Sequence, residues 1–374
     1  MAGIYIHIPF CRKACIYCDF HFSTVLKSKN DLIKSILIEQ ELRKNYLEDE
    51  VIETIYFGGG TPSVLDKRDL ELILNQIYTY NRVDVNVEIS LECNPDDLDE
   101  KYLIDLKSLG INRLSIGLQS FNEEELQWMN RSHTAIQAER CVKLAQDIGF
   151  SNISVDLIYG SKFQTEELWL ENLNKVFQLK VQHLSAYNLT VENKTVLGHN
   201  VKIGKELETD ESLSVHHFNS LLIHAEKNGF IQYEISNFCV EGYYSRHNSN
   251  YWKGSKYLGL GPSAHSFNIN SRQWNISNNN AYINQLKKGK QPFELENLSS
   301  EQCYNEYVMT SLRTIWGVSR VEIKRRFGDV FLTHFNSTIS SYIQSEDVIV
   351  NNEVYVLSNK GKLLADRIAS DVFI

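Results

Sequence analysis

Short apolar runs alternate with stretches of helical periodicity through the first 230 residues. The runs predict strands at 4–8, 53–57, 86–91, 113–118, 153–158 and 183–189. Between them, apolar residues recur at steps of three and four, as in Leu70, Ile73, Leu74 and Ile77, which is typical of one buried helix face. The same spacing predicts helices over 35–46 and over 138–148, the second ended by Gly149.

This alternation predicts βαβ units and a parallel sheet. We expect an α/β fold in which six strands form a partial or complete β/α barrel. A doubly wound sheet is the alternative that the pattern leaves open.

The pattern changes after about residue 230. Residues 236–280 are rich in Asn, Ser, Gly and Tyr, which predicts loops and short strands. A helical run begins at Ser299, and the chain ends in a helix, a hairpin (348–350 and 354–357) and a helix from Lys360. We therefore predict three parts, 1–235, 236–298 and 299–374, of which the last is a smaller α+β module resembling a winged helix.

The composition is that of an ordinary globular protein. The 374 residues are 43% apolar and 23% charged, with a net charge of −9. The acidic balance argues against nucleic-acid binding. No apolar run reaches the roughly 18 residues of a membrane span, and the first ten residues lack a basic start, so we expect a cytoplasmic protein without a signal peptide.

Three of the seven cysteines lie within eight residues, as Cys11, Cys15 and Cys18. The odd total and the absence of a secretory signal argue against a disulfide framework. Closely spaced thiolates suit an iron–sulfur cluster or zinc. A zinc site would need His21 as a fourth ligand, whereas three cysteines on a four-iron cluster leave one iron open.

Polar residues at predicted strand ends form a second group of candidates. The turn Gly58-Gly59-Gly60-Thr61-Pro62 lets the backbone approach a ligand closely, although a tight turn explains it equally well. Glu92, Gln119 and Asp156 follow or interrupt apolar strands, and Arg131 is a candidate partner for the carboxylates. In a β/α barrel such strand ends converge on one site, but ion pairs and helix caps are the competing uses.

The C-x3-C-x2-C motif resembles that of the radical S-adenosylmethionine (SAM) superfamily. The resemblance implies a [4Fe-4S] cluster whose open iron is chelated by SAM, which a reduced cluster can cleave to a 5′-deoxyadenosyl radical. It also implies that the glycine turn contacts the methionyl amino group of SAM.

The wider sequence resembles the family of oxygen-independent coproporphyrinogen III oxidase and its relatives over nearly the whole chain. The resemblance rests on Tyr-Ile-His-Ile-Pro-Phe-Cys, Gly-Gly-Gly-Thr-Pro, Glu-Cys-Asn-Pro, Gly-Leu-Gln-Ser-Phe, Asn-Arg-Ser-His and Leu-Gly-Leu-Gly-Pro-Ser-Ala-His. It implies that Cys11, Cys15 and Cys18 hold the cluster. It places SAM contacts at Tyr5, Tyr17, Gly59, Gly60, Thr61, Glu92, Gln119, Arg131 and Asp156, and a further one at Thr190.

Two features place the chain in the heme-chaperone branch of that family. The oxidase carries a fourth cysteine two residues after the third, where this chain has Phe20. The segment His247-Asn-Ser-Asn-Tyr251-Trp252 matches the H-N-x-x-Y-W pattern of the chaperones. By this resemblance the chain binds heme and passes it to an acceptor protein, and it does not decarboxylate coproporphyrinogen. A transient contact with a membrane-associated acceptor is compatible with this role.

Within that segment, His247 is the expected iron ligand, because histidine is a common axial ligand of heme. Tyr251 and Trp252 offer flat surfaces for stacking on the porphyrin. Packing and hydrogen bonding inside the protein are the alternative uses of these residues, and His265, His7, His21 and His133 are rival ligands. The oxidase, or a radical SAM enzyme with another substrate, remains the alternative function.

Overall fold

The computed structural model describes residues 1–374 and contains all six predicted strands. They lie in sequence order, each parallel to the next. A doubly wound sheet reverses its strand order partway, so this order excludes that alternative. The strands are β1 (Ala2–Ile8), β2 (Ile52–Gly59), β3 (Val83–Cys93), β4 (Arg113–Gln119), β5 (Ile153–Tyr159) and β6 (His183–Asn188).

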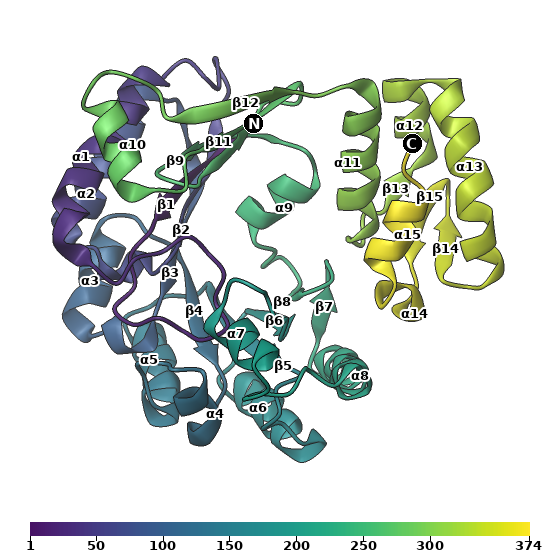
Figure 1. Cartoon of the computed structure of the whole chain (residues 1–374), viewed down its shortest axis with the longest axis horizontal. Coiled ribbons are helices and arrows are strands. Elements are labelled where there is room, and N and C mark those ends of the chain that lie inside the picture. Colours follow the sequence, from purple (N-terminus) through teal and green to yellow (C-terminus); the bar gives the residue numbers. More distant parts are fainter.

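Helices cover the outer face of these curved strands, as Figure 1 shows. In α2 the predicted face is buried, and the Asp66 carboxylate caps the helix by accepting from the Asp69 N–H at 3.0 Å. The helix predicted over 138–148 begins with a capping box at Thr134 and is followed by Gly149 at φ +93°. The helices are α1 (Lys29–Leu42), α2 (Lys67–Tyr80), α3 (Glu100–Ser108), α4 (Glu123–Trp128), α5 (Ala135–Asp147), α6 (Glu166–Gln178), α7 (Val196–Lys202) and α8 (Glu211–Lys227).

The sheet continues past both ends of the six strands and stays open. The strand β9 (Lys256–Leu260) pairs parallel with β1, and antiparallel strands follow it. These are β10 (His265–Phe267), β11 (Ser271–Asn275) and β12 (Phe293–Asn297), while β8 (Asn237–Val240) and β7 (Phe230–Gln232) extend β6. The expected partial barrel is confirmed, and the expected loop region 236–280 additionally contains the helix α9 (Arg246–Trp252).

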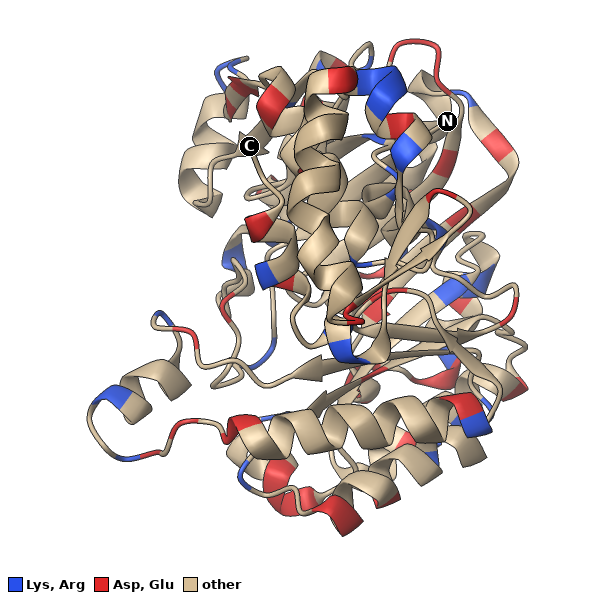
Figure 2. Ribbon diagram, turned by 90° about the vertical axis from the view of Figure 1, so that its right-hand side faces the viewer, with Lys and Arg blue, Asp and Glu red and all other residues tan.

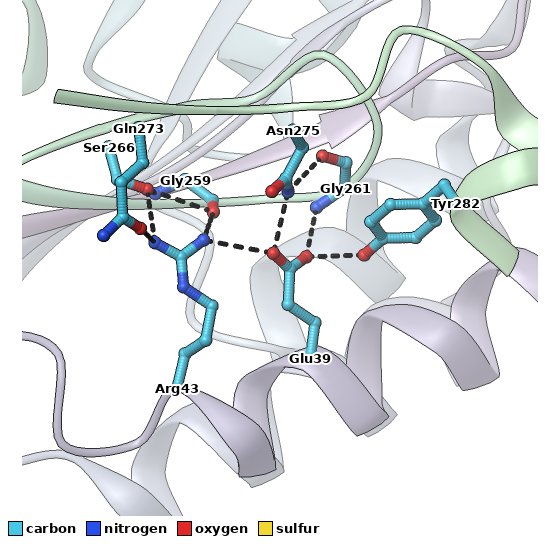
Figure 3. Close-up of polar contacts among 8 residues, drawn as sticks. All are labelled: Glu39, Arg43, Gly259, Gly261, Ser266, Gln273, Asn275 and Tyr282. Atoms are coloured by element: carbon cyan, nitrogen blue, oxygen red, sulfur yellow. Dashed lines mark hydrogen bonds and ion pairs between the residues drawn. The ribbon is translucent and has the colours of Figure 1, made fainter. Parts of the chain in front are cut away.

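A buried polar network ties this antiparallel extension to α1 (Figure 3). Arg43 Nη2 donates to Ser266 Oγ at 2.9 Å, and Glu39 Oε2 accepts from the Gly261 N–H at 2.9 Å. The Tyr282 hydroxyl of α10 (Asn279–Leu286) donates to the same carboxylate. The network fixes the turn between β9 and β10 against the barrel.

The C-terminal part has its own small core, separate from the main one. Its three-stranded antiparallel sheet confirms the predicted hairpin and adds the two-residue strand β13, which the sequence did not predict. Figure 1 places this part beside α9, and Figure 2 shows acidic and basic residues intermingled on its side of the molecule. Its elements are α11 (Ser300–Leu312), β13 (Val318–Ser319), α12 (Arg320–Phe327), α13 (Asp329–Gln344), β14 (Val348–Asn351), β15 (Val354–Leu357), α14 (Asn359–Lys362) and α15 (Ala365–Asp371).

None of the helices combines the length and the apolar character that crossing a membrane requires. The boundaries at 235 and 298 stay predictions, although residues 256–297 contribute strands to the main sheet.

Candidate functional site

The three clustered cysteines lie on the loop that follows β1, and all are free thiols. Each is partly exposed. The Thr61 hydroxyl donates to Cys11 Sγ at 3.3 Å, and Arg131 Nη1 donates to Cys15 Sγ at 3.3 Å. Donors aimed at sulfur stabilise thiolates, so this donor set fits a thiolate-ligated iron–sulfur cluster.

The alternative of a zinc ion held by these cysteines and His21 does not fit the geometry. No group of three His, Cys, Asp or Glu side chains converges closely enough to hold a single metal ion. His21 Nε2 instead forms a 2.8 Å hydrogen bond with Asn279 Oδ1. A zinc ion needs its ligands at about 2.0–2.3 Å from one point, whereas a four-iron cluster is a larger body with more widely spaced ligands.

The glycine turn at the end of β2 packs against the cysteine loop. Gly60 N donates to the Ile8 carbonyl at 2.9 Å, and Thr61 N donates to the Phe10 carbonyl at 2.7 Å. A Cβ on Gly60 would lie 2.8 Å from the Phe10 carbonyl oxygen. Gly59 has φ +108°, and a Cβ there would lie 2.6 Å from the His7 ring. Both positions therefore require glycine because a side chain would clash there. At Gly59 the positive φ also favours glycine.

Glu92, at the end of β3, faces this turn. Its carboxylate accepts from the Tyr56 hydroxyl at 2.9 Å and from the Gly59 N–H at 3.2 Å. Burial raises the pKa of Glu92 to about 7, an effect that the nearby Asp156 carboxyl reinforces. The carboxyl therefore titrates near neutral pH, which is typical of groups at functional sites.

Asp156 occupies the middle of β5, where the sequence showed a carboxylate in an apolar strand. Its Oδ1 accepts from the Ser115 hydroxyl at 3.4 Å. Burial raises its pKa to about 6, against the opposing effects of Ser185 and Arg113. Hydrogen bonds to two serines therefore offset only part of the desolvation.

Arg131 links several strand ends. Besides Cys15, its guanidinium contacts the Asn94 side chain at 2.8 Å and the Gly117 carbonyl at 2.7 Å. Its Nε is buried without a partner in the chain. Gln119 lies beside it and has a left-handed backbone, with φ +66°. Arg131 does not pair with a carboxylate, contrary to the use suggested by the sequence.

The last two predicted SAM contacts differ in their placement. Tyr17 lies next to Cys15 and Arg131, so it belongs to the group around the cysteines. Thr190 is exposed after β6, and its hydroxyl contacts only the Asn188 carbonyl at 3.5 Å. The fold brings the other predicted residues to one end of the sheet, and no contact joins Thr190 to them.

A cavity of about 850 Å³ opens next to the cysteine loop, between the barrel and the C-terminal part. Its floor contains Tyr5 and His7, and Asp19, Phe20 and His21 form the side that follows Cys18. Aromatic residues from α9, β9, β10 and the C-terminal part form the remaining walls, among them Tyr251, Trp252, Tyr257, Phe267, Tyr307 and Trp316. The volume is within the range of binding sites for drug-sized and cofactor-sized ligands.

His247 does not line this cavity, although Tyr251 and Trp252 do. The imidazole is buried, with 2% of its surface exposed. Its Nδ1 lies 2.7 Å from Thr54 Oγ1 and its Nε2 lies 2.8 Å from the Tyr251 hydroxyl. Because both ring nitrogens are engaged, the geometry supports a structural role for His247 and not the expected one of iron ligand.

Several residues of the site had no separate signal in the sequence. Asn94 lies within the Glu-Cys-Asn-Pro segment, and Tyr56 lies two residues before the glycine turn, so their neighbourhood could have pointed to them. Ser115 and Ser185 alternate with apolar residues along their strands, which places them on Asp156's side of the sheet. The cavity residues of the C-terminal part lie more than 280 residues after the cysteines, and no local pattern indicates them.

Comparisons with known proteins agree with this geometry. The Radical SAM superfamily model matches residues 5–176. The heme chaperone HemW of Bacillus subtilis (strain 168) is 32% identical over 377 residues, which cover 98% of each chain. The heme chaperone HemW of Escherichia coli (strain K12) is 35% identical over 267 residues, covering 70% of this chain and 69% of that one.

Among solved structures, coproporphyrinogen III oxidase (HemN) from Escherichia coli, a radical SAM enzyme, matches with a TM-score of 0.87. The match covers 100% of this chain and 90% of that one at 21% identity. It confirms the radical SAM fold, including the small C-terminal part.

Proposed function

The chain belongs to the HemW family of heme chaperones, within the radical SAM superfamily, and from this premise we propose that it binds heme beside a SAM-ligated [4Fe-4S] cluster and transfers the heme to an acceptor protein. The main observation behind the proposal is that the cysteine loop and the aromatic cavity lie side by side. The cavity is lined by the residues that directly follow Cys18, so a ligand in it lies next to the cluster loop.

In this proposal Cys11, Cys15 and Cys18 ligate the cluster. When bound, such a cluster supplies one-electron transfer and an open iron for the amino and carboxylate groups of SAM. Thr61 and Arg131 orient two of the thiolates through the hydrogen bonds described above. The Gly59–Gly60 backbone and the Glu92 carboxylate hold the methionyl end of SAM, because they converge beside the cysteine loop.

The remaining predicted contacts surround the same end of the sheet. Tyr5, Tyr17, Gln119, Arg131 and Asp156 complete the SAM site, and Thr190 is a peripheral candidate on its exposed loop.

Heme occupies the aromatic cavity. A porphyrin has two flat apolar faces, and the aromatic walls supply matching surfaces for stacking. Tyr251 and Trp252 belong to these walls, whereas His247 supports Tyr251 from behind through its hydrogen bond to the hydroxyl. The H-N-x-x-Y-W segment then contributes stacking surface and rigidity.

Coproporphyrinogen oxidation is the alternative, and Phe20 is the feature against it. Phe20 stands where the oxidase has a cysteine, and the residue is 68% exposed at the edge of the cavity. A phenyl ring has no proton to transfer and no sulfur to bind a metal. An exposed aromatic ring at this position instead adds an apolar surface for a porphyrin.

The proposal is tested with full-length protein whose cluster has been rebuilt without oxygen. We expect about four irons and four sulfides per chain and one heme per chain that survives desalting. Cys11→Ala, Cys15→Ala and Cys18→Ala should each lose most of the iron and sulfide, whereas Cys141→Ala, whose thiol is buried in the main core, should keep them.

Turnover of coproporphyrinogen III is measured in parallel. Decarboxylation without oxygen, or a wild-type protein that retains no heme, would contradict the proposal. An unchanged iron content in the three cysteine variants would contradict the ligand assignment alone.

A further inference from the structure

Three histidines line the proposed heme cavity, and they differ in what their ring nitrogens contact. His7 is engaged on both sides, with Nδ1 3.2 Å from the Tyr5 hydroxyl and Nε2 2.9 Å from the His21 carbonyl. His21 uses Nε2 in its bond with Asn279. His265 makes no hydrogen bond through its ring, so both of its nitrogens are available to a ligand.

The backbone holds His265 in a fixed place on the cavity wall. It begins β10, opposite Trp274 of β11. A Cβ on Gly259 would lie 2.0 Å from the His265 carbonyl oxygen, so the two strands approach closely only because residue 259 is glycine. The next residue, Ser266, accepts a hydrogen bond from Arg43, which follows α1. The backbone of His265 is therefore fixed on the cavity wall, and its ring nitrogens have no partner within the chain that would compete with a metal ion.

Three basic side chains line the cavity, and two of them form no ion pair. Arg272 is paired with Glu306 at 2.6 Å. Lys253 and Arg326 take part in no ion pair, and each lies over aromatic rings instead. Lys253 Nζ is 4.3 Å from the Trp316 ring centroid, and Arg326 Cζ is 5.0 Å from that of Tyr307. Both side chains are exposed at the opening of the cavity. Glu322 also lines the cavity near Arg326, but its carboxylate is paired with Arg325 at 2.7 Å.

We propose that His265 is an axial ligand of the heme iron and that Lys253 and Arg326 bind the two heme propionates. The inference rests on the proposed heme function and assigns the residues that carry it. Heme presents one metal that accepts imidazole nitrogen and two carboxylates at one edge. The cavity offers one unengaged imidazole on its barrel side and two unpaired cations at its opening, which matches those three groups.

The surroundings of His265 also favour the neutral form of its ring. The pKa of His265 is lowered by partial desolvation at the cavity wall and by the Arg272 charge, so the ring is neutral at pH 7 although the residue is exposed. A neutral imidazole has a free lone pair, whereas an imidazolium has none.

The iron ligand is tested by adding ferric heme to the full-length protein and recording its Soret band and electron paramagnetic resonance (EPR) spectrum. His265→Ala should lose the imidazole-ligated signal and bind heme about tenfold more weakly. Added imidazole should restore the signal. His265→Met should give a different, thioether-ligated spectrum. Such a spectrum would show that the variant is folded, and circular dichroism provides a second check of folding. His247→Ala should keep the imidazole-ligated spectrum.

The propionate contacts are tested with heme dimethyl ester, whose carboxylates are blocked. Lys253→Gln with Arg326→Gln should weaken heme binding about tenfold and leave binding of the ester unchanged. An unchanged spectrum and affinity for His265→Ala, or loss of the imidazole signal only in His247→Ala, would overturn the ligand assignment while the chaperone function stands. Equal effects on heme and its ester would overturn the propionate assignment. A wild-type chain that binds no heme would contradict the proposed function itself.

Discussion

Glu39 on α1 and Arg43, the residue that follows the helix, form an ion pair at 3.1 Å that is closed off from solvent. Figure 3 shows how both side chains reach from the helix to the β9–β11 extension. Arg43 donates to the Gly259 carbonyl at 3.0 Å and to Ser266, while Glu39 accepts from Gly261 and Asn275. The pair therefore fixes the wall of the cavity that carries His265.

Arg43→Met should destabilise the protein strongly. The change removes the cation and leaves the Glu39 carboxylate buried without its partner, which costs about 3–5 kcal/mol for a buried pair. The quantity to measure is the shift of the urea unfolding midpoint, converted with the slope of the transition. The double change Glu39→Gln with Arg43→Met should destabilise less than the sum of the single changes, because no uncompensated charge remains.

The exposed pair Glu139–Lys143 is the matched control, since it has the same spacing on α5. Lys143→Met should cost less than about 1 kcal/mol, because both charges there stay hydrated. Equal losses at the two sites would show that burial of the Glu39–Arg43 pair does not matter to stability.

The sequence predicted those parts of the fold that depend on local pattern. The six strands and the buried face of α2 were evident because apolar periodicity is set by neighbours along the chain. The cysteine loop and the strand-end residues were evident because parallel strands bring their ends together. By contrast, Glu39 meets Asn275 from 236 residues away, and α9 is rich in residues that are indifferent helix formers.

The role of His247 shows the same limit at the site. Its motif indicated heme, but its partner Thr54 lies 193 residues earlier on β2, and only the packing of α9 onto that strand brings them within hydrogen-bond distance. Such long-range contacts decide whether an imidazole faces a cavity or a threonine. The local spacing of residues in the sequence does not predict them.

Gly59→Ala should impair SAM binding and stability together. The added methyl group would lie within 2.6 Å of the His7 ring, at a backbone φ of +108° that alanine adopts poorly. We expect a loss of about 2 kcal/mol or more in stability and at least a tenfold weaker affinity for SAM, measured by urea unfolding and by calorimetry.

Gly242→Ala is the control that separates the cost of the backbone conformation at Gly59 from the cost of the steric clash with His7. Gly242 also has a positive φ, +87°, but a Cβ there meets nothing within 4 Å. This variant should lose only about 1 kcal/mol and bind SAM normally. A Gly59→Ala protein that behaves like Gly242→Ala would show that the contact with His7 does not constrain the turn.

The raised pKa of Glu92 predicts a pH dependence of stability in the protein without SAM. The carboxyl binds its proton with a pKa of about 7 when folded, against 4.5 in an unstructured chain. Between these values the folded state holds more protons than the unfolded state, so this group's contribution to stability is present below pH 4.5 and is lost as the pH rises to about 7. Glu92→Gln removes that contribution.

The measurement is the difference in unfolding free energy between wild type and Glu92→Gln at pH 5.5 and at pH 8. Taking the difference cancels the titration of groups that do not interact with Glu92, which leaves Glu92 itself and the neighbouring Asp156 carboxyl. We expect the wild type to lose stability relative to the variant as the pH rises. A difference that is constant with pH would mean that Glu92 titrates at its ordinary value despite its burial.

Binding of SAM should show the opposite pH trend at the same residue. The ionised Glu92 carboxylate accepts hydrogen bonds, whereas the protonated form loses acceptor capacity and charge. If Glu92 holds the methionyl end of SAM, deprotonation favours the complex, so wild-type affinity should rise between pH 6 and pH 8 more steeply than that of Glu92→Gln. Calorimetric titrations at both pH values give the comparison. Parallel pH profiles for the two proteins would remove Glu92 from the SAM site, because the variant keeps the size and shape of the side chain but does not titrate.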